Sequence, residues 1–453
     1  MPFNPERLLN ILLTYPQPSG YLLGFSGGLD SHVLLHALAA LGERLPAPLR
    51  AIHVDHGLQG QSAAWAGHCA SICRELNIPL ETFSLQLTPA QGESLEAVAR
   101  EARYGLLARE LKPMEMLLTA HHQDDQAETL LLQLLRGAGI SGLAAMPPLA
   151  EFSQGRHARP LLNVTRDELL RYATRAGLRW IEDASNRDIA FDRNYIRHQV
   201  IPLLKARWPA MASTLSRSAR HCAEADRLIE TLLSRTLERI HQPADGTLSV
   251  AALNALPADQ QSALLRIWFG QRGVPSPASV ILQRIISEVL GARQDATPRV
   301  AWSGAEVRRY RDRLYLMPPL APFDPSLSLV WGGEPALTLP AGLGTLHFRP
   351  SAEEMGERTE SGRYRIRFRQ GGEQCRPLGR GVGKRVKALL QETGVLPWMR
   401  ERIPLLEVNG EIAELIGICR CEPAAQDPLL RGLQISWNCP LLWRQSSPVN
   451  KAD

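Results

Sequence analysis

Over the first 190 residues, short apolar runs alternate with longer stretches in which apolar positions recur every three or four residues. The short runs predict β-strands, and the longer stretches predict amphipathic helices. Near-continuous apolar strands separated by helices are typical of a parallel sheet that is covered on both faces. We therefore expect an α/β amino-terminal domain with strands at 21–25, 49–54, 80–85 and 116–120 and helices at 32–41, 62–76, 94–111 and 123–135.

A further helix is expected at 196–207, and the pattern changes after residue 208. A long amphipathic stretch at 211–240 is followed by shorter helical stretches at 250–256, 259–270 and 277–290 and by a small strand pair at 305–310 and 313–317. Four prolines within 317–325 predict an extended linker. The last region begins with β-rich sequence, and a helix with Val386, Leu389 and Leu390 as core positions follows it. We expect a catalytic domain at 1–208, a mostly helical domain at 209–317, a linker at 318–328 and a small α+β domain at 329–445.

Polar residues directly follow three of the predicted strands. Residues 26–31 follow the first strand, Asp55 and His56 lie at the end of the second, and residues 121–129 follow the fourth. In open parallel sheets, ligands bind outside the carboxyl ends of the strands. We therefore expect these three polar clusters to meet in one cleft.

The first cluster, Ser-Gly-Gly-Leu-Asp-Ser at 26–31, has the pattern of a strand, a glycine-rich turn and a helix. Paired glycines allow close approach of the backbone, and a helix amino terminus presents free N–H groups to an anion. The turn lacks the lysine of the common NTPase loop. It predicts a phosphate-binding turn, and a plain glycine-rich turn with a capping serine is the alternative.

The third cluster contains acids that share one helical face, because Asp125 and Glu128 are three residues apart. Acids in a first turn can serve simply as caps. Beside a phosphate-binding turn, carboxylates instead indicate Mg²⁺ held partly by substrate phosphates. The adjacent His121 and His122 lack the spacing of a zinc motif. On the helix at 94–111, Arg100 is either an ordinary surface partner of an acid or, with Arg103, a phosphate ligand.

Composition indicates a globular protein of several domains, with 453 residues, 44% hydrophobic and 21% charged. We expect no membrane span and no signal peptide, because no apolar run is long enough and the amino terminus lacks a basic region. The seven cysteines include no C-x-x-C pair, which favours reduced thiols in the cytoplasm. Cys69 and Cys73 share a helical face and are expected to be small buried residues.

The net charge is only +5, but the basic residues are clustered. Residues 363–387 carry seven Arg and two Lys against one acid, a local net of 9 − 1 = +8. At 363–369 strict alternation places four arginines on one face of a strand. A solvated face is one interpretation. Because like charges without acidic partners repel one another, a bound polyanion is the favoured one.

These motifs together resemble the tRNA(Ile)-lysidine synthetases, a branch of the PP-loop (N-type) ATP pyrophosphatases. The turn at 26–31 matches the family's S-G-G-x-D-S loop, residues 53–58 match its H-x-D-H-G-L motif, and residues 122–129 match H-x-x-D-Q-A-E-T. Residues 136–143, 183–186, 194–197 and 375–390 continue the match in order, so the resemblance spans most of the chain. Gln59 departs from the family, which often has Arg there.

The resemblance implies a PP-loop (Rossmann-like) fold and a two-step reaction. The C2 oxygen of the wobble cytidine in an isoleucine tRNA with a CAU anticodon attacks the α-phosphorus of ATP and releases pyrophosphate. The ε-amine of free L-lysine then displaces AMP, so that the tRNA carries lysidine and reads AUA. ATP and Mg²⁺ are the implied cofactors, and a homodimer is expected from the relatives.

The resemblance also assigns roles to residues. Asp30, Asp125 and Glu128 are expected to be catalytic, and Asp30 is also expected to bind Mg²⁺ together with phosphates. The ATP-binding residues are expected to be Ser26, Gly27, Gly28, Leu29, Asp30, Ser31, Asp55, His56, Arg100, Arg103 and His122. Contacts with tRNA or lysine are expected from Asp183, Ser185, Asn186, Asn194, Arg197, Arg363, Arg365, Arg367, Arg369 and Lys384.

Two other interpretations stay open. A tRNA thiolase of the same superfamily would need catalytic or cluster-binding cysteines, and the only close pair before Cys222 is Cys69 and Cys73, in the middle of a predicted helix. A non-catalytic RNA-binding protein with a nucleotide fold would bind tRNA without turning over ATP. The sequence favours the ligase.

Overall fold

The computed structural model describes residues 2–55, 62–85, 95–182, 188–293, 296–350 and 363–441. It divides into two compact units, Met1–Ile229 and Glu230–Asp453, and each is described by itself. His56, Asp183, Ser185 and Asn186 lie outside the described residues.

The first unit is built on a six-stranded sheet in the order β3-β2-β1-β4-β6-β5. Adjacent strands are parallel except for β5, which pairs antiparallel with β6 at the edge. The four predicted strands and the α/β class are confirmed, whereas the hairpin of β5 and β6 was not predicted. The strands are β1 (Tyr21–Gly24), β2 (Leu49–Asp55), β3 (Leu80–Ser84), β4 (Met116–Leu118), β5 (Leu149–Phe152) and β6 (Gly155–Ala158).

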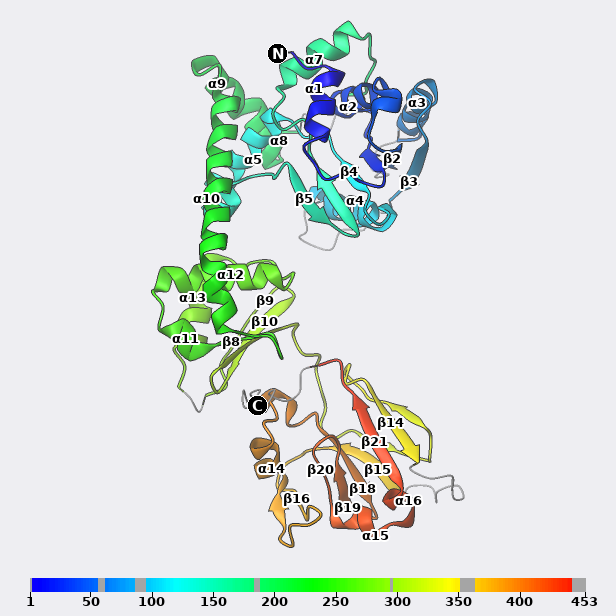
Figure 1. Cartoon of the computed structure of the whole chain (residues 1–453), viewed down its shortest axis with the longest axis vertical. Helices are drawn as coiled ribbons and strands as arrows, with labels where there is room; N and C mark the ends of the chain where they lie inside the picture. Colours follow the sequence, from blue (N-terminus) through cyan, green and yellow to red (C-terminus); the bar gives the residue numbers. More distant parts are fainter. Residues whose placement is uncertain are drawn as a thin grey trace. The chain divides into compact units, whose positions relative to one another are not determined.

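Helices cover both faces of this sheet (Figure 1). Successive residues of a strand point to opposite faces, so Leu23 joins one buried cluster, with residues of α1, α2, α3 and α7, and Leu22 joins another, with Leu107 of α4. This two-sided burial explains the continuous apolar sequence of β1. The helices are α1 (Pro5–Leu12), α2 (Leu29–Ala39), α3 (Ser62–Glu75), α4 (Leu95–Glu110), α5 (Gln123–Leu135), α6 (Ile140–Leu143), α7 (Arg166–Arg175), α8 (Asp192–Tyr195) and α9 (Ile201–Arg207).

Two helix starts differ from the sequence prediction. Helix α2 begins at Leu29, with Gly28 as its cap, so Asp30 and Ser31 lie in its first turn and not before it. The helix predicted from residue 196 is instead α8, a π-helical segment (Ile196–Val200) and α9 in succession. π-Helical segments are frequent at functional sites.

Helix α10 (Met211–Ile240) matches its prediction and contains the boundary between the two units. After it, a buried cluster that includes Leu264, Trp268 and Val307 packs helices against a five-stranded antiparallel sheet in the order β7-β8-β11-β10-β9. Only β10 and β11 of this sheet were predicted. The elements are β7 (His241–Gln242), β8 (Thr247–Ser249), α11 (Val250–Asn254), α12 (Ala258–Gln271), α13 (Ser279–Arg284), β9 (Arg299–Trp302), β10 (Ala305–Tyr310) and β11 (Arg313–Met317).

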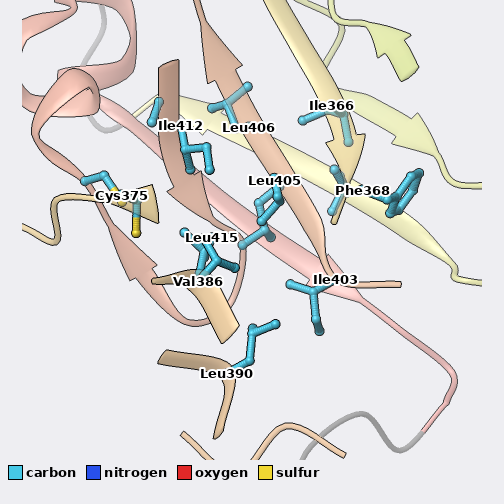
Figure 2. Close-up of a cluster of buried hydrophobic side chains, with 14 of the residues drawn as sticks. Ile366, Phe368, Cys375, Val386, Leu390, Ile403, Leu405, Leu406, Ile412 and Leu415 are labelled. Atoms are coloured by element: carbon cyan, nitrogen blue, oxygen red, sulfur yellow. The ribbon is translucent and has the colours of Figure 1, made fainter. Parts of the chain in front are cut away.

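The carboxy-terminal region is rich in short strands around a large apolar core, part of which is shown in Figure 2. The alternation at 363–369 is confirmed, because Tyr364, Ile366 and Phe368 are buried on one face of β15. Helix α14 buries Val386, Leu389 and Leu390 as predicted. The elements are β12 (Ser328–Val330), β13 (Ala336–Thr338), β14 (Thr345–Pro350), β15 (Tyr364–Phe368), β16 (Gln374–Cys375), β17 (Lys384–Arg385), α14 (Val386–Glu392), β18 (Pro404–Val408), β19 (Glu411–Leu415), β20 (Cys419–Arg420), α15 (Glu422–Gln426), α16 (Pro428–Arg431) and β21 (Leu433–Asn438).

Candidate active site

The turn at 26–31 leaves the carboxyl end of β1, which lies inside the sheet between β2 and β4. Its two serines bond to each other, with Oγ atoms 3.0 Å apart, and the Ser31 hydroxyl donates to the Gly28 carbonyl at 3.1 Å. Gly27 has a φ of +79°, and a Cβ there would lie 2.8 Å from the Cys69 Sγ, so the position requires glycine. The result is a tight turn at the start of α2.

Asp30 and His122 bring the turn next to the loop that follows β4. His122 Nε2 lies 3.5 Å from one oxygen of Asp30 and 3.4 Å from one oxygen of Asp125. Burial alone would lower the pKa of His122, but these two carboxylates raise it to about 9. His122 is therefore a cation at neutral pH that links two of the predicted carboxylates. The second oxygen of Asp30 is buried and has no hydrogen-bond partner among the described residues.

Asp125 and Glu128 are paired with two arginines from the segment after residue 188. Arg197 Nε donates to Glu128 at 2.6 Å and its Nη2 donates to Asp125 at 2.9 Å, while Arg193 Nε donates to Glu128 at 2.9 Å. The Glu128 side chain is 1% exposed and that of Asp125 is 12% exposed. Burial alone would raise the pKa of Asp125, but His122, Arg193 and Arg197 lower it. Both carboxylates are therefore hydrogen-bonded to arginines.

Arg100 and Arg103 lie on α4 close to Tyr104, with guanidinium carbons 5.1 and 5.5 Å from its ring centre. Burial lowers the pKa of Arg103, and the positive charges of Arg100 and Arg193 lower it further. Within the described part of the chain, neither arginine has a carboxylate within 4.0 Å. Clustered cations without acids are suited to an anionic ligand.

For two other predicted site residues, Asp55 and Asn194, the structure shows hydrogen bonds that involve backbone carbonyl groups. Asp55 ends β2, and its carbonyl accepts a hydrogen bond from the Leu85 N–H at 2.8 Å. The Asn194 side chain donates to the Asp188 carbonyl at 2.9 Å, so it fixes the segment before α8.

Arg193 was missing from the residues predicted for the site. Its spacing of four from Arg197 places both on one helical face, and that signal was present in the sequence. His157, described below, lies on β6 in a strand of mixed polarity and gave no such signal.

The interpretation that the arginine face at 363–369 lacks acidic partners is wrong. Arg363 pairs with Asp427 at 2.7 Å, Arg367 bonds to Glu407 at 2.5 Å, and Arg369 lies 3.8 Å from Glu373. The sequence pattern missed these acids because Glu407 and Asp427 come from segments far along the chain. Among the described residues, Arg365 alone of the four has no carboxylate within 4.0 Å.

Lys384 is also paired, with Nζ at 2.9 Å from Glu392. The free positive charge of this face is therefore smaller than the sequence count suggests.

A phosphate-binding turn after the first strand of a parallel sheet, facing carboxylates after the fourth, defines the PP-loop class of ATP-binding enzymes. The family model of the PP-loop domain matches residues 4–204. Models of the TilS substrate binding domain and the TilS substrate C-terminal domain match residues 248–315 and 364–437.

A tRNA(Ile)-lysidine synthase from Coxiella burnetii is 41% identical over 422 residues, which cover 93% of each chain. One from Methylococcus capsulatus is 45% identical over 405 residues, 88% of this chain and 91% of that one. The chain belongs to the tRNA(Ile)-lysidine synthase family of PP-loop ligases.

A solved U34-tRNA thiolase, NcsA from Methanococcus maripaludis, is 18% identical with a TM-score of 0.42 over 49% of this chain and 78% of that one. This likeness is too weak to bear on function. No helix in the described ranges is both long and apolar enough to cross a membrane.

Proposed function

We propose that this chain joins free L-lysine to C2 of the wobble cytidine in the isoleucine tRNA with a CAU anticodon. In the first step the cytidine O2 attacks the α-phosphorus of ATP and the bond to pyrophosphate breaks. In the second step the lysine ε-amine attacks C2, the bond from C2 to oxygen breaks and AMP leaves. The observation that carries the proposal is the phosphate-type turn at 26–31 held against the carboxylate and arginine cluster by the pairing of Asp30 with His122.

The turn supports the first step. Its backbone N–H groups at the start of α2 suit the pyrophosphate oxygens, on which negative charge develops as the bond breaks. Arg103 and Arg100 supply cations without carboxylate partners among the described residues, and we assign them to the α-phosphate. Asp55 and His56 complete the ATP-binding set that the family resemblance implies.

Asp30 fits a magnesium ligand. One of its oxygens is buried and has no hydrogen-bond partner among the described residues. Mg²⁺ binds carboxylate oxygens, so this oxygen is suited to bind the cation. When bound, Mg²⁺ would neutralise the charge of the phosphates. Asp30 itself, together with the Ser26 and Ser31 hydroxyls, would hold and orient the pyrophosphate end.

We assign different roles to the two other predicted catalytic carboxylates. Asp125 is the more exposed, and its negative charge suits the ammonium group of the incoming lysine. Glu128 is almost fully buried between Arg193 and Arg197, so we assign it to positioning those arginines. Arg197 is held in position by ion pairs with the same two carboxylates. From this position its guanidinium group would contact the α-phosphate of ATP or the RNA.

We further propose the domain division 1–208 for catalysis, 209–317 and 329–445 for tRNA contact, and 318–328 as the linker. Asp183, Ser185, Asn186 and Asn194 are proposed to lie against the wobble base, and the basic carboxy-terminal face against the tRNA backbone. The homodimer and the cytoplasmic location stay predictions.

The experiment is to incubate the protein with the CAU-anticodon isoleucine tRNA, L-lysine and α-labelled ATP. We expect labelled AMP and lysine incorporated into the RNA. A non-catalytic RNA-binding protein would give neither, and a thiolase would give AMP without lysine incorporation. The thiolase alternative is disfavoured by burial of the two nearby thiols, because burial raises the pKa of Cys69 to about 12 and that of Cys73 to about 11.

Asp30→Ala tests the assigned role of the turn. We expect adenylation of the tRNA to be abolished while tRNA affinity stays within a few fold, because Asp30 acts on the nucleotide and not on the RNA. Asp167→Ala is the matched control, since Asp167 lies on α7 and its carboxylate forms a surface ion pair with Lys205 at 2.9 Å. A large loss of tRNA binding in Asp30→Ala would contradict the assignment.

A further inference from the structure

Four polar side chains form one hydrogen-bonded chain across the carboxyl ends of β4 and β6. Arg159 Nη2 lies 3.1 Å from His157 Nδ1, and His157 Nε2 lies 2.8 Å from the Thr119 hydroxyl. The same hydroxyl lies 2.8 Å from His121 Nδ1. Neither histidine has a role in the function proposed above, although His121 directly precedes His122.

The positions of the protons in this hydrogen-bonded chain can be assigned by starting from the Arg159 guanidinium group. A guanidinium can only donate, so His157 Nδ1 accepts, and its ring carries its proton on Nε2. That N–H donates to the Thr119 oxygen, and the Thr119 hydroxyl proton is then available to His121 Nδ1. His121 Nδ1 is therefore an acceptor, and the ring carries its proton on Nε2. Both rings are neutral by geometry alone.

Their surroundings favour the same state. Burial lowers the pKa of His121 to about 3; Asp125 opposes this fall, and Arg159, Arg193 and Arg100 add to it. Burial also lowers the pKa of His157 to about 3, with Arg159, His121 and Arg100 acting in the same direction. Neither ring becomes charged in the physiological pH range.

His121 Nε2 lies at the other end of this series of hydrogen bonds. It makes no hydrogen bond to any described residue, and the His121 residue is only partly buried. The charges that act on its ring include Asp125 and Arg193 of the carboxylate and arginine cluster and Arg100 of α4. The N–H is therefore presented among the groups assigned above to substrates.

We propose that His121 presents a fixed, neutral Nε2–H donor to an anionic oxygen of a bound substrate, either a phosphoryl oxygen of the nucleotide or the carboxylate of the amino acid. Thr119, His157 and Arg159 are positioning residues that hold this tautomer. Such a donor stabilises negative charge without adding a further cation to a site that already holds several arginines. It also excludes His121 as a general base, since Nδ1 is occupied by Thr119 and Nε2 already carries a proton. The proposal rests on the proposed function for the identity of the substrates.

The tautomer is tested without turnover, so this measurement stays informative if the proposed function fails. Long-range ¹H–¹⁵N correlation on the full chain labelled at histidine reports which ring nitrogen carries the proton, with signals assigned by comparison with His121→Gln and His157→Gln. We expect both rings to be neutral and protonated on Nε2 from pH 8 to about pH 5. A proton on Nδ1 of His121, or a doubly protonated ring at pH 7, would overturn the proposal.

Kinetics tests the donor itself. His121→Ala is expected to lower kcat/KM about 10- to 100-fold, as for loss of a hydrogen bond to a charged group, and His121→Gln, whose amide can donate from nearly the same place, is expected to recover most of it. If the acceptor is a nucleotide oxygen, His121→Ala should slow the tRNA-dependent ATP–pyrophosphate exchange that is measured without lysine. If the acceptor is the lysine carboxylate, this exchange should be normal and the KM for lysine should rise.

Thr119→Val removes the hydroxyl that fixes the tautomer of His121. It is expected to lower kcat/KM as His121→Ala does, but by a smaller factor. Thr174→Val is the matched control, because the Thr174 hydroxyl on α7 bonds only to the Leu170 carbonyl at 2.9 Å. Unchanged kinetics in His121→Ala, or equal losses in the alanine and glutamine variants, would refute the donor role.

Discussion

Six charges meet around His122, three of each sign. His122, Arg193 and Arg197 face Asp30, Asp125 and Glu128 within 3.5 Å. These six groups are therefore balanced among themselves, and Asp124, 3.8 Å from His122 Nδ1, adds one further negative charge beside them. A balanced cluster resists the desolvation penalty that a lone buried charge would carry.

Glu414 shows the opposite situation in the carboxy-terminal region. Its side chain is 9% exposed, and its nearest cation is Arg420, with Nε at 3.3 Å from the carboxylate. Burial raises the pKa of Glu414 to about 7 against the opposing effect of Arg420. A carboxyl whose pKa is raised on folding contributes stability that is full below its unfolded pKa and is lost as the pH rises through the folded value.

Glu414→Gln is therefore expected to change the pH dependence of stability. The native chain should lose up to roughly 3 kcal/mol between pH 4.5 and pH 7 through this group, and the variant should not. Urea unfolding followed by tryptophan fluorescence at pH 5 and pH 8 measures the difference. Glu411→Gln, at an exposed position of the same strand, should behave as the native chain does. Equal pH dependence in all three proteins would contradict the prediction.

At the scale of elements, the ion pairs of Glu128 join α5 to the segment formed by α8 and the π-helical turn. Both oxygens of Glu128 accept hydrogen bonds from Arg193 and Arg197, one turn apart on the facing segment. A buried charge that loses its partner is far more costly than an exposed one. The segment from 192 to 200 is therefore fixed by charge as much as by apolar packing.

Glu128→Gln is expected to destabilise the first unit by about 3–5 kcal/mol, because two partly buried guanidinium groups lose one of their two carboxylate partners. Thermal or urea unfolding of the full chain measures this loss. Glu151→Gln is the matched control, since the 82% exposed Glu151 pairs with Arg156 on the surface and should cost under about 0.5 kcal/mol. An equal effect of the two substitutions would show that the buried pair does not hold the segment.

The elements differed in how far the sequence could predict them. The strands β1, β2, β3 and β4 and the helices after them were predictable, because their apolar patterns along the chain are strong. The hairpin of β5 and β6 was not, since Gly155–Ala158 has mixed polarity and its pairing with β4 joins segments that are far apart in the chain.

The same holds for the site. Asp30, Asp125 and Glu128 follow from spacing along the chain, and the structure brings them together through His122 and two arginines. The hydrogen-bonded chain from Arg159 to His121 depends on how β6 lies beside β4, which no local pattern encodes.

At the scale of the whole molecule, the attraction for a polyanion depends on which arginines are free. Among the described residues of the 363–369 face, Arg365 is exposed and has no acid within 4.0 Å, whereas Arg367 bonds to both Glu407 and Glu373. Phosphate contacts follow free charge, because a guanidinium already paired with a carboxylate releases fewer counterions on binding.

Arg365→Ala is therefore expected to weaken tRNA binding and to reduce the slope of log K against log salt by about 0.9 if the contact is duplex-like. Stability of the chain should be unchanged. Arg367→Ala, on the same strand face, should instead lower stability, since Glu407 loses its arginine partner and Glu373 loses one of its two, with a smaller effect on the salt slope. Binding titrations at several salt concentrations and urea unfolding distinguish the two, and an unchanged slope in Arg365→Ala would mean that this face does not meet phosphate.

The interior position of β1 also sets the order in which the site forms as the chain is synthesised. The turn at 26–31 gains its second neighbouring strand only when Met116–Leu118 has been made, and Arg193 and Arg197 are translated later still. A nascent chain that ends before these arginines holds Asp30, Asp125 and Glu128 with His122 as their only counter-charge, and it should repel nucleotide phosphates. We therefore expect full nucleotide affinity only after residue 197 has left the ribosome, when folding of the first unit can be completed.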